Sequence, residues 1–246
     1  TGIRRPISYF RENVFGMRKI PYITVQNPHR YGEHLIKTPW IMSDNVASWT
    51  WSGCELSPVI VEVYAPGTEV ELVRNGESLG KQASGKAAGY RALFETTYEP
   101  GTLTAVAYEN GQEIGRMDLT TAGEDCMFVF GTEEILDELI YVPVAYRDAA
   151  GTVAPDADQT ISLTVSGGAE LFGFGSGNPK PESNPEKHAT QTFLGRAMII
   201  LKKTADKENV VLTLTAENGS VEKLELSLAD MGSDQQTLRV SESVKL

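Results

Sequence analysis

The spacing of apolar residues changes character near residue 49. From there to about residue 120, apolar and polar side chains alternate in short runs, as in residues 58–64, whose valines share one face. Turn signals separate the runs every ~8–12 residues. The strongest is Asn75-Gly76, because both central residues of a type I′ hairpin turn need a positive φ. The pattern predicts an immunoglobulin-like β-sandwich over residues 49–122.

A second series of strand-like runs begins after a short linker at residues 122–125. It predicts a second immunoglobulin-like β-sandwich over residues 123–230, followed by a polar C-terminal tail at 231–246. Pro143 falls on the opposite face from the inward side chains of its run. Because proline cannot donate a ladder hydrogen bond, it predicts an edge strand or a bulge. The expected runs are residues 139–146, 161–165, 210–214 and 221–228.

The first 48 residues do not continue the β pattern. Apolar side chains at near-helical spacing, with Pro6 before them and Gly16 after them, predict a short helix. A strand-like run at 20–25 and a polar loop at 27–39 follow. Since the segment holds too few apolar positions to fold alone, we interpret residues 1–48 as the stub of the end of an upstream domain and a linker. The first residue is Thr, which suggests a processed or excised chain. The predicted fold class is all-β, with two immunoglobulin-like β-sandwich domains preceded by this helical and irregular stub.

Composition narrows the class of partner. The 246 residues carry a formal net charge of −11. An acidic surface repels phosphate, so nucleic acid and anionic membranes are poor partners, whereas a neutral sugar is not disfavoured. Hydrophobic residues make up 41% and charged residues 22%, which is ordinary for a folded globular chain. No run approaches ~18 consecutive apolar residues, so we expect no membrane span.

The cysteines and histidines offer little for a metal or redox site. Cys54 and Cys126 lie on opposite sides of the expected domain boundary. A disulfide between them is an alternative, and two separate thiols are the preferred interpretation. The three histidines form no Cys/His pair at ligand spacing. We therefore expect neither a metal ion nor a cofactor.

Acidic residues are numerous, but none stands in a local pattern typical of catalysis. Acid–base hydrolysis by two carboxylates requires a fixed separation on a rigid wall and one raised pKa. We expect the acids of the first 62 residues to be solvated surface charges, because Glu and Asp are rarely buried. The glycines of residues 173–177 lack the Lys-Ser/Thr ending of a phosphate-binding loop, and a bulge with a tight turn is the better interpretation. The acids considered are Glu12, Glu33, Asp44, Glu55 and Glu62.

All three tryptophans lie within twelve residues. Trp49 and Trp51 share a face if their segment is extended, and Trp40 precedes them. Two interpretations are open. The preferred one is that the rings pack the seam between the leading segment and the first sandwich. The alternative is that they bind the apolar side of a sugar ring, which makes Trp40, Trp49 and Trp51 the candidate sugar contacts.

Several segments together resemble the C-terminal region of glycoside hydrolase family 2, in its β-galactosidase-like branch. The Trp49-Thr50-Trp51 motif resembles the entry to the sandwich that follows the family's catalytic barrel, and Asn75-Gly76 resembles a hairpin of that sandwich. The order and spacing of the matching segments make the resemblance fairly specific, and they cover nearly the whole chain. These segments are residues 1–11, 49–53, 58–64, 71–80, 98–108, 121–123, 151–158 and 171–179.

The departures from the family pattern decide what the resemblance implies for chemistry. Family members are retaining enzymes whose acid/base is a Glu preceded by Asn, with a second Glu as nucleophile on the barrel. This chain contains no Asn-Glu dipeptide. It also has no room for a barrel, which needs ~250 residues of its own. The resemblance therefore implies a parent that hydrolyses terminal β-galactosides or related β-glycosides, with both catalytic residues upstream of Thr1 and no catalytic residue in this chain.

Three hypotheses follow. The chain is the accessory region of a family 2 glycosidase, which supports the barrel and shapes its outer sugar subsites. Alternatively, it is an independent carbohydrate-binding or adhesive module, or a self-sufficient enzyme, which the missing catalytic pair argues against. Residues 1–48 favour the first, because a free-standing module has no need of an orphan helix. The expected partner is the upstream catalytic barrel of the same polypeptide, with an oligosaccharide as a further candidate.

Overall fold

A computed structural model describes residues 4–34, 43–179, 188–205 and 208–228. The chain divides into two compact units between Ala122 and Gly123, within the segment that the sequence indicates as a linker. Residues 2–122 are the first unit here and residues 123–246 the second unit. Both consist of antiparallel sheets, so the prediction of an all-β fold is confirmed.

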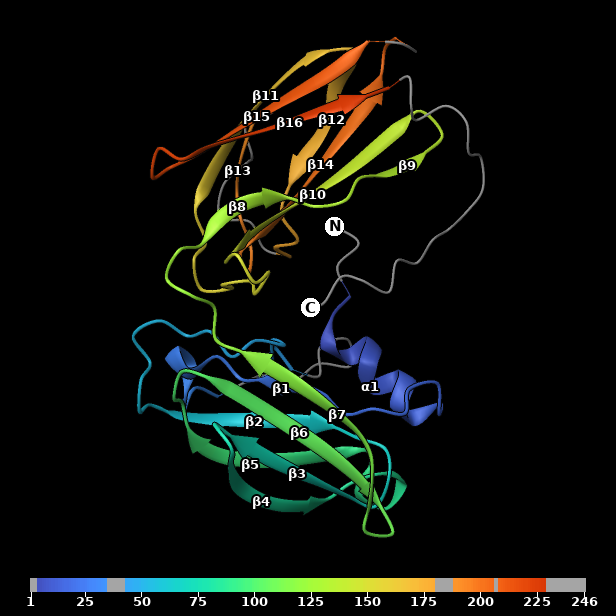
Figure 1. Ribbon diagram of the computed structural model, residues 1–246, viewed down its shortest axis with the longest axis vertical. Coiled ribbons are helices and arrows are strands. Elements are labelled where there is room, and N and C mark those ends of the chain that lie inside the picture. Colours follow the sequence, from blue (N-terminus) through green and yellow to red (C-terminus); the bar gives the residue numbers. More distant parts are fainter. Residues whose placement is uncertain (1–3, 35–42, 180–187, 206–207, 229–246) are drawn as a thin grey trace. The chain divides into compact units, whose positions relative to one another are not determined.

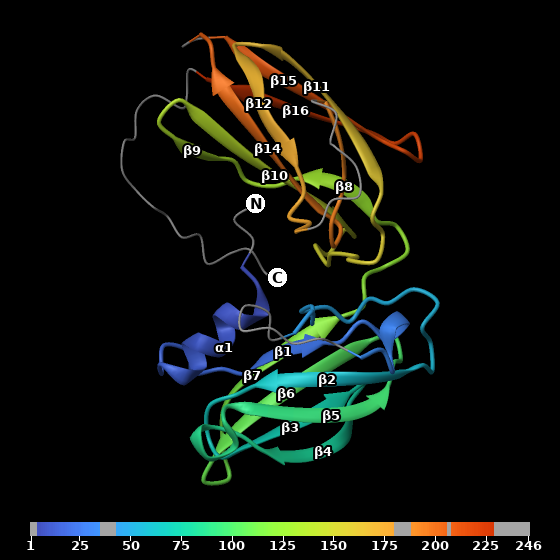
Figure 2. The ribbon, with the colours of Figure 1, turned by 180° about the vertical axis from the view of Figure 1, so that it is seen from behind.

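Two sheets form the first unit, one with strand order β1-β2-β5 and one with order β4-β3-β6-β7. Figures 1 and 2 show these strands from opposite sides. The first sheet contains β1 (Tyr22–Val25), β2 (Pro58–Tyr64) and β5 (Arg91–Thr97). The second contains β3 (Glu69–Arg74), β4 (Glu77–Ala83), β6 (Thr102–Glu109) and β7 (Gln112–Thr120). The helical elements are α1 (Pro6–Val14), η1 (Pro28–Arg30) and η2 (Lys86–Ala88).

Strand β1, from the segment before residue 49, completes the first sheet. It pairs antiparallel with β2, from Tyr22 opposite Tyr64 to Val25 opposite Val61. Alternation along β1 turns Ile23 and Val25 into the core, where both are fully buried. The predicted helix is present as α1 and lies beside β1 and β2 (Figure 1). The leading segment is thus part of the same compact unit as the sandwich.

The core of the first unit follows the predicted alternation. The valines of β2 face Val70 and Leu72 of the other sheet, together with alternate residues of β5 and β6. Asn75 and Gly76 have φ values of 51° and 85°, which is the backbone of a type I′ turn. The residues of this core are Ile23, Val25, Trp49, Trp51, Cys54, Val59, Val61, Val63, Ala65, Val70, Leu72, Ala92, Phe94, Tyr98, Leu103, Ala105, Ala107 and Leu119.

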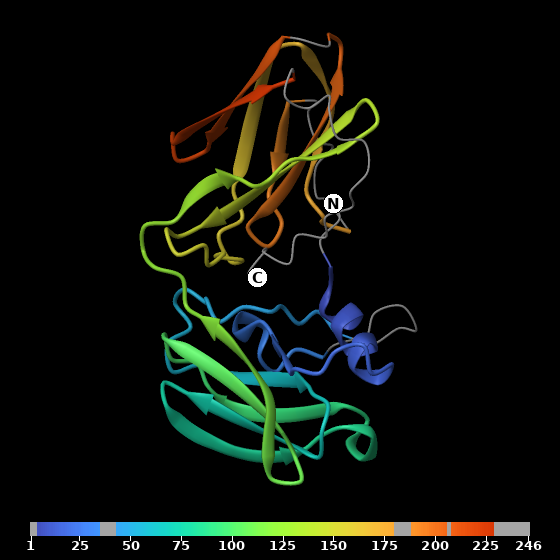
Figure 3. The ribbon, with the colours of Figure 1, turned by 45° about the vertical axis from the view of Figure 1, so that its right-hand side comes forward.

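The second unit is a two-sheet sandwich with its own core (Figure 3). One sheet has the order β12-β14-β10-β8, with β9 also paired to β10, and the other has the order β13-β11-β15-β16. The first sheet contains β8 (Met127–Phe130), β9 (Glu134–Leu136), β10 (Leu139–Arg147), β12 (Ala169–Gly175) and β14 (Arg196–Lys203). The second contains β11 (Thr160–Gly167), β13 (Ala189–Gln191), β15 (Asn209–Ala216) and β16 (Val221–Ser227).

Pro143 corrects one expectation. Strand β10 is an interior strand and pairs with β14 without a register shift, so the prediction of an edge strand is wrong. On its other side the pairing shifts by one residue at Pro143, from Tyr141 opposite Glu134 to Val144 opposite Phe130, which agrees with the alternative prediction of a bulge. The proline is accommodated where the neighbour of β10 changes from β9 to β8. The carbonyl oxygen of Pro143 accepts a hydrogen bond from the Gly131 amide at 2.7 Å. Its nitrogen faces the same side, where no ladder donor is required.

Two further expectations from the sequence concern the cysteines and membrane-spanning segments. Neither Cys54 nor Cys126 forms a disulfide. In the described part of the chain, no helix is long and apolar enough to cross a membrane. The expected polar tail at 231–246 lies outside the described residues.

We expect Trp51→Ala to lower the free energy of unfolding of the first unit by about 3–5 kcal/mol, because it removes a fully buried indole and leaves a cavity. All three tryptophans belong to this unit, so indole fluorescence during urea unfolding follows it alone. Leu93→Ala is the control, since Leu93 is exposed, and it should change stability by less than about 1 kcal/mol. Equal stability of Trp51→Ala and the unchanged chain would contradict the burial of this ring.

We expect Ile23→Ala to destabilise the first unit by about 2–5 kcal/mol, because Ile23 fills the core from β1. The same fluorescence transition measures the effect. Ile20→Ala, two residues before the strand at a half-exposed position, should cost less than half as much. If Ile23→Ala leaves the transition unmoved, β1 is not part of the sandwich in solution.

Candidate functional site

Trp49 and Trp51, two of the candidate sugar contacts, are turned into the core of the first unit. Their side chains are 0% and 1% exposed. The Trp49 indole N–H donates to the carbonyl oxygen of Glu99 at 2.8 Å, and the Tyr98 ring meets the indole edge-on with centroids 5.0 Å apart. A ring without exposed surface cannot stack on a sugar, so both side chains act in packing. Trp40 lies outside the described residues.

Hydrogen bonds fix this tryptophan segment at one end of the strands. The Thr121 hydroxyl donates to the carbonyl oxygen of Trp49 at 2.6 Å, and the Ala122 amide donates to Thr50 Oγ1 at 2.9 Å. Burial of the segment therefore also anchors the last residues of the first unit. The indole nitrogen of Trp51 is buried and has no hydrogen-bond partner among the described residues.

An aromatic cluster joins α1 to the outer face of the β1-β2-β5 sheet. The ring of Tyr9 stacks on that of Tyr22, with centroids 3.9 Å apart, and the ring of Tyr64 lies parallel to Tyr22 at 6.5 Å. The Arg4 guanidinium lies 4.2 Å from the Tyr9 centroid, and the Arg18 guanidinium lies 5.3 Å from the centroids of Tyr9 and Tyr22. Stacking and cation–π attraction thus hold the helix on the sheet.

Glu62 lies beside this cluster and is buried, so the expectation of a solvated charge is wrong for this residue. It lies on the outer face of β2 and is 3% exposed. Arg91 of β5 forms an ion pair with it, and the Asn45 side-chain amide donates to Oε2 at 2.9 Å. These partners compensate the loss of water around the carboxylate. Burial raises the pKa of the Tyr64 phenol, and the neighbouring Glu62 raises it further.

The other acids that the sequence singled out do not form a pair. Glu33 and Glu55 are exposed. Glu12 pairs with Arg4, and Asp44 lies 3.7 Å from Arg30. The hydrogen bonds and ion pairs of the described residues therefore do not bring Glu62 and these four carboxylates together as a catalytic pair.

Asp158 is the described carboxyl group with a pKa raised by burial, which is one requirement of an acid catalyst. Its Oδ1 accepts hydrogen bonds from the Gly195 amide at 3.1 Å and the Thr192 hydroxyl at 3.3 Å, and these oppose the rise. The carboxylate therefore ties the turn before β14 to the loop before β11. This role explains the partial desolvation of the carboxyl group without a substrate.

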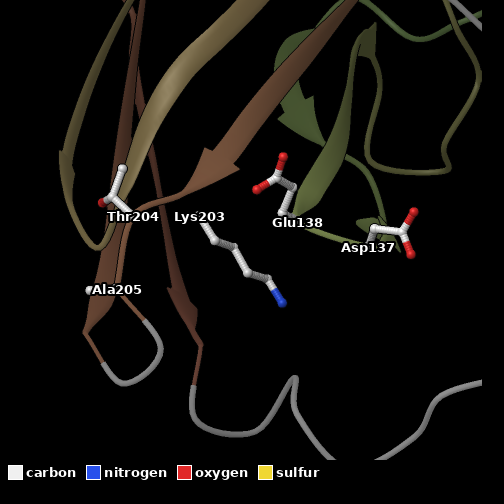
Figure 4. A pocket seen from close by; sticks show the side chains of 5 residues that line it. All are labelled: Asp137, Glu138, Lys203, Thr204 and Ala205. Atoms are coloured by element: carbon white, nitrogen blue, oxygen red, sulfur yellow. The ribbon is translucent and has the colours of Figure 1, made fainter.

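A shallow hollow at the turn between β9 and β10 brings acidic and basic side chains together (Figure 4). Asp137 and Glu138 come from that turn, and Lys203 comes from the end of β14. The carboxylates of Asp137 and Glu138 point away from each other in this view. They therefore lack the convergence that acid–base hydrolysis requires. Thr204 and Ala205 complete the lining.

The fold brings one histidine and one cysteine together. The Sγ atom of Cys54 lies 3.4 Å from both ring nitrogens of His29, which sits in η1. The part of the chain that the structure describes contains no cluster of three or more His, Cys, Asp and Glu residues that could hold a metal ion. His34 and His188 are exposed. A thiol beside a single imidazole is two ligands short of a tetrahedral zinc site.

Sequence reasoning missed the exposed aromatic residue of the second unit. Phe172 is the extra residue at a register shift in β12, between Leu171 and Gly173, and its side chain is exposed. The bulge itself is the one expected from the glycines of this segment. An aromatic residue directly before the first glycine of the predicted bulge was the available signal, since a bulge redirects a side chain. Gly173, Ile200 and Tyr141 lie in one row across the same sheet.

Comparison with known proteins adds a family to this geometry. Residues 134–225 match the model of the glycoside hydrolase family 2 C-terminal domain 5, and residues 57–115 match a domain of unknown function. A β-galactosidase of Bacteroides ovatus is 25% identical over 74% of this chain and 22% of its own length. A putative β-glucuronidase of Formosa agariphila is 29% identical over 67% of this chain and 17% of its own length.

The fold comparison agrees. The crystal structure of a glycosyl hydrolase family 2 member from Bacteroides cellulosilyticus matches with a TM-score of 0.78 at 27% identity, over 92% of this chain and 30% of that protein. The chain thus spans less than a third of the length of each of these three proteins. Residues 134–225 therefore form a C-terminal domain of glycoside hydrolase family 2, and the chain as a whole is similar to the C-terminal part of that family's proteins.

Proposed function

We propose that the chain is the non-catalytic accessory region of a retaining family 2 glycoside hydrolase, and that it supports the catalytic barrel of the same polypeptide. The observation that carries the proposal is the match to a C-terminal domain model together with coverage of less than a third of the matched proteins. Two of those proteins are named as a β-galactosidase and a putative β-glucuronidase. The substrates proposed for the parent are accordingly β-galactosides or related β-glycosides.

The environments of the Glu62 and Asp158 carboxylates support a structural role. Glu62 is occupied by Arg91 and Asn45, and Asp158 by Gly195 and Thr192. A retaining glycosidase instead needs two carboxyl groups about 5 Å apart, facing a bound sugar. Each of these two carboxylates binds partners within its own unit. This agrees with catalytic residues that lie elsewhere in the parent.

The two separate cores support a scaffold role. Each unit buries its own set of apolar side chains, and the first unit incorporates α1 and β1 through strand pairing and ring stacking. A rigid, packed unit fixes the position of the domain attached to it, whereas a flexible linker does not. Accessory units of this kind can therefore hold a neighbouring domain in a fixed place.

We expect the purified 246-residue chain to release no nitrophenol from 4-nitrophenyl β-galactoside or β-glucuronide, while the complete polypeptide that the gene encodes hydrolyses at least one of them. The reason is that hydrolysis requires a pair of carboxylates on a barrel, and the described residues form antiparallel sandwiches and no barrel. Absorbance of released nitrophenolate measures both. Turnover by the chain alone, surviving further purification, would overturn the proposal.

Sugar binding by the second unit is a second candidate function, favoured by the exposed ring of Phe172. The ring stands on the outer face of the β12-β14-β10-β8 sheet, beside Gly173 and Gly175, which have no side chains to obstruct a flat ligand. An exposed aromatic ring offers the apolar surface against which a sugar can stack. Such binding would shape an outer subsite of the parent.

If this second function holds, Phe172→Ala should weaken the binding of the chain to an oligosaccharide found on a glycan array by about tenfold or more, as for an aromatic anchor. Titration calorimetry with that oligosaccharide measures the change. Phe15→Ala, which removes an exposed ring from the first unit, is the matched control and should leave the affinity unaltered. An array without any bound glycan would exclude the sugar-binding role.

A further inference from the structure

A second aromatic ring lies on the same face of the second unit as Phe172. Along β10, Ile140 and Val142 are fully buried in the core. The side chain of Tyr141 between them therefore points to the outer face of the sheet, where it is partly exposed. Phe172 stands on this face at the bulge of β12 and is 63% exposed. Neither proposed function makes use of Tyr141.

The register of the sheet places the two rings in one row. Gly173, directly after Phe172, pairs with Ile200 of β14, and Ile200 pairs in turn with Tyr141. A Cβ atom added to Gly173 would lie 3.6 Å from Ile200 Cδ1, so the Ile200 side chain belongs to this face. The strands β12, β14 and β10 are successive neighbours in the sheet (Figure 1). Because neighbouring strands are about 4.8 Å apart, the two rings rise from backbones roughly 10 Å apart. Phe172, Gly173, Ile200 and Tyr141 are called the aromatic platform here.

The surface next to the aromatic platform is low and apolar. Gly175, Met198 and Pro143 pair with one another in the neighbouring row, two residues further along each strand. No described atom lies within 4 Å of the position that a Cβ of Gly175 would take. A glycine in a strand leaves room for the close approach of a ligand. Strand β12 is also an edge of the sheet, so a long ligand can continue past Phe172.

Polar side chains border the aromatic platform on its other sides. Glu170 pairs with Lys202 in the next row, and the Lys202 ammonium lies 3.4 Å from a carboxylate oxygen of Glu138. Glu134 of β9 pairs with Tyr141 at the end of the row and is exposed. These groups supply acceptors and donors for the hydroxyl groups of a sugar. Since three of the four are acidic, the border favours a neutral sugar over an anionic one.

We propose that the aromatic platform binds a neutral, linear glycan of β-1,4-linked hexoses with equatorial linkages, which runs across the strands from β12 to β10. The proposal rests on the sugar-binding function proposed above for Phe172, and it names the ligand. One hexose unit of such a chain advances about as far as one strand spacing, about 5 Å. Alternate units of this flat ribbon present the same face. Two such units therefore stack on Phe172 and Tyr141, with the unit between them over Ile200.

This geometry sets the shortest ligand and the linkage. A trisaccharide is the shortest chain that reaches both rings, whereas a disaccharide reaches one ring at a time. An α-1,4-linked chain of the same hexose curls, so its alternate units do not present the same face to Phe172 and Tyr141. Chain length and linkage thus distinguish the row of two rings from a single exposed ring.

Titration calorimetry of the 246-residue chain tests this geometry without any substitution. We expect cellotriose to bind about tenfold more tightly than cellobiose, or better, because the second ring adds a second aromatic anchor. Maltotriose contains the same hexose in α-1,4 linkage and should show no such gain over maltose. This comparison decides the proposal even if a variant of the platform fails to fold.

Substitutions assign the gain to the second ring. Tyr141→Leu removes the ring and keeps an apolar side chain. It should abolish the gain from cellobiose to cellotriose and leave the affinity for cellobiose within about twofold. Leu136→Ala is the matched control, because Leu136 is exposed on the same sheet but pairs with Leu139, outside the row. It should leave both affinities unaltered, and circular dichroism melting curves check that each variant is folded.

Failure of this inference is distinguishable from failure of the function on which it rests. Glycan binding that Phe172→Ala abolishes, with equal affinity for cellobiose and cellotriose or an equal gain with maltotriose, would overturn the β-1,4 geometry alone. No binding of any oligosaccharide would overturn sugar binding and this inference together, and it would leave the accessory role untouched. Dimers in sedimentation experiments that Phe172→Ala abolishes, without glycan binding, would show a second copy of the chain on the platform and would also overturn the inference.

Discussion

The pairing of β1 with β2 is the interaction on which the arrangement of the first unit depends. It places Ile23 and Val25 in the core and, on the other face of the same strand, Tyr22 under α1 and Thr24 beside Glu62. The Thr24 hydroxyl donates to the carbonyl oxygen of Glu62 at 3.0 Å, and Asn45 donates to both side chains. One four-residue strand therefore connects the hydrophobic core, the aromatic cluster and the buried ion pair.

The carboxylates of Glu62 and Asp158 bind partners within their own units, and the indoles of Trp49 and Trp51 fill the core of the first unit. Exposed apolar side chains, by contrast, lie at Phe172 and at the end of α1, where Phe15 and Met17 are exposed. The surfaces available for binding are thus separate from the groups that stabilise each unit. This separation is expected, because a binding surface must remain accessible.

Much of this fold was predictable, because apolar and polar side chains alternate clearly along a strand that has one buried face and one solvated face. Strand β14 escaped prediction since Met198 and Ile200 make its outer face apolar as well, so residues 197–201 show no alternation. Strand β4 shows no alternation because it buries almost nothing, and only the Asn75-Gly76 hairpin signal indicated it. The burial of Glu62 depends on Arg91, which is distant in sequence, and no local pattern reports such pairs. The sequence left two interpretations open for Trp49 and Trp51, and the full burial of both side chains depends on tertiary packing.

The stacking of Tyr9 on Tyr22 has a consequence for how the chain opens. A nine-residue helix is too short to be stable in isolation, so α1 owes its structure to the strands beneath it. Its amide hydrogens should exchange with solvent at the same free energy of opening as those of β1 and β2, as members of one cooperative unit. Helix and sandwich therefore melt as a single thermodynamic body, and anything bound to α1 would share the stability of the sheet.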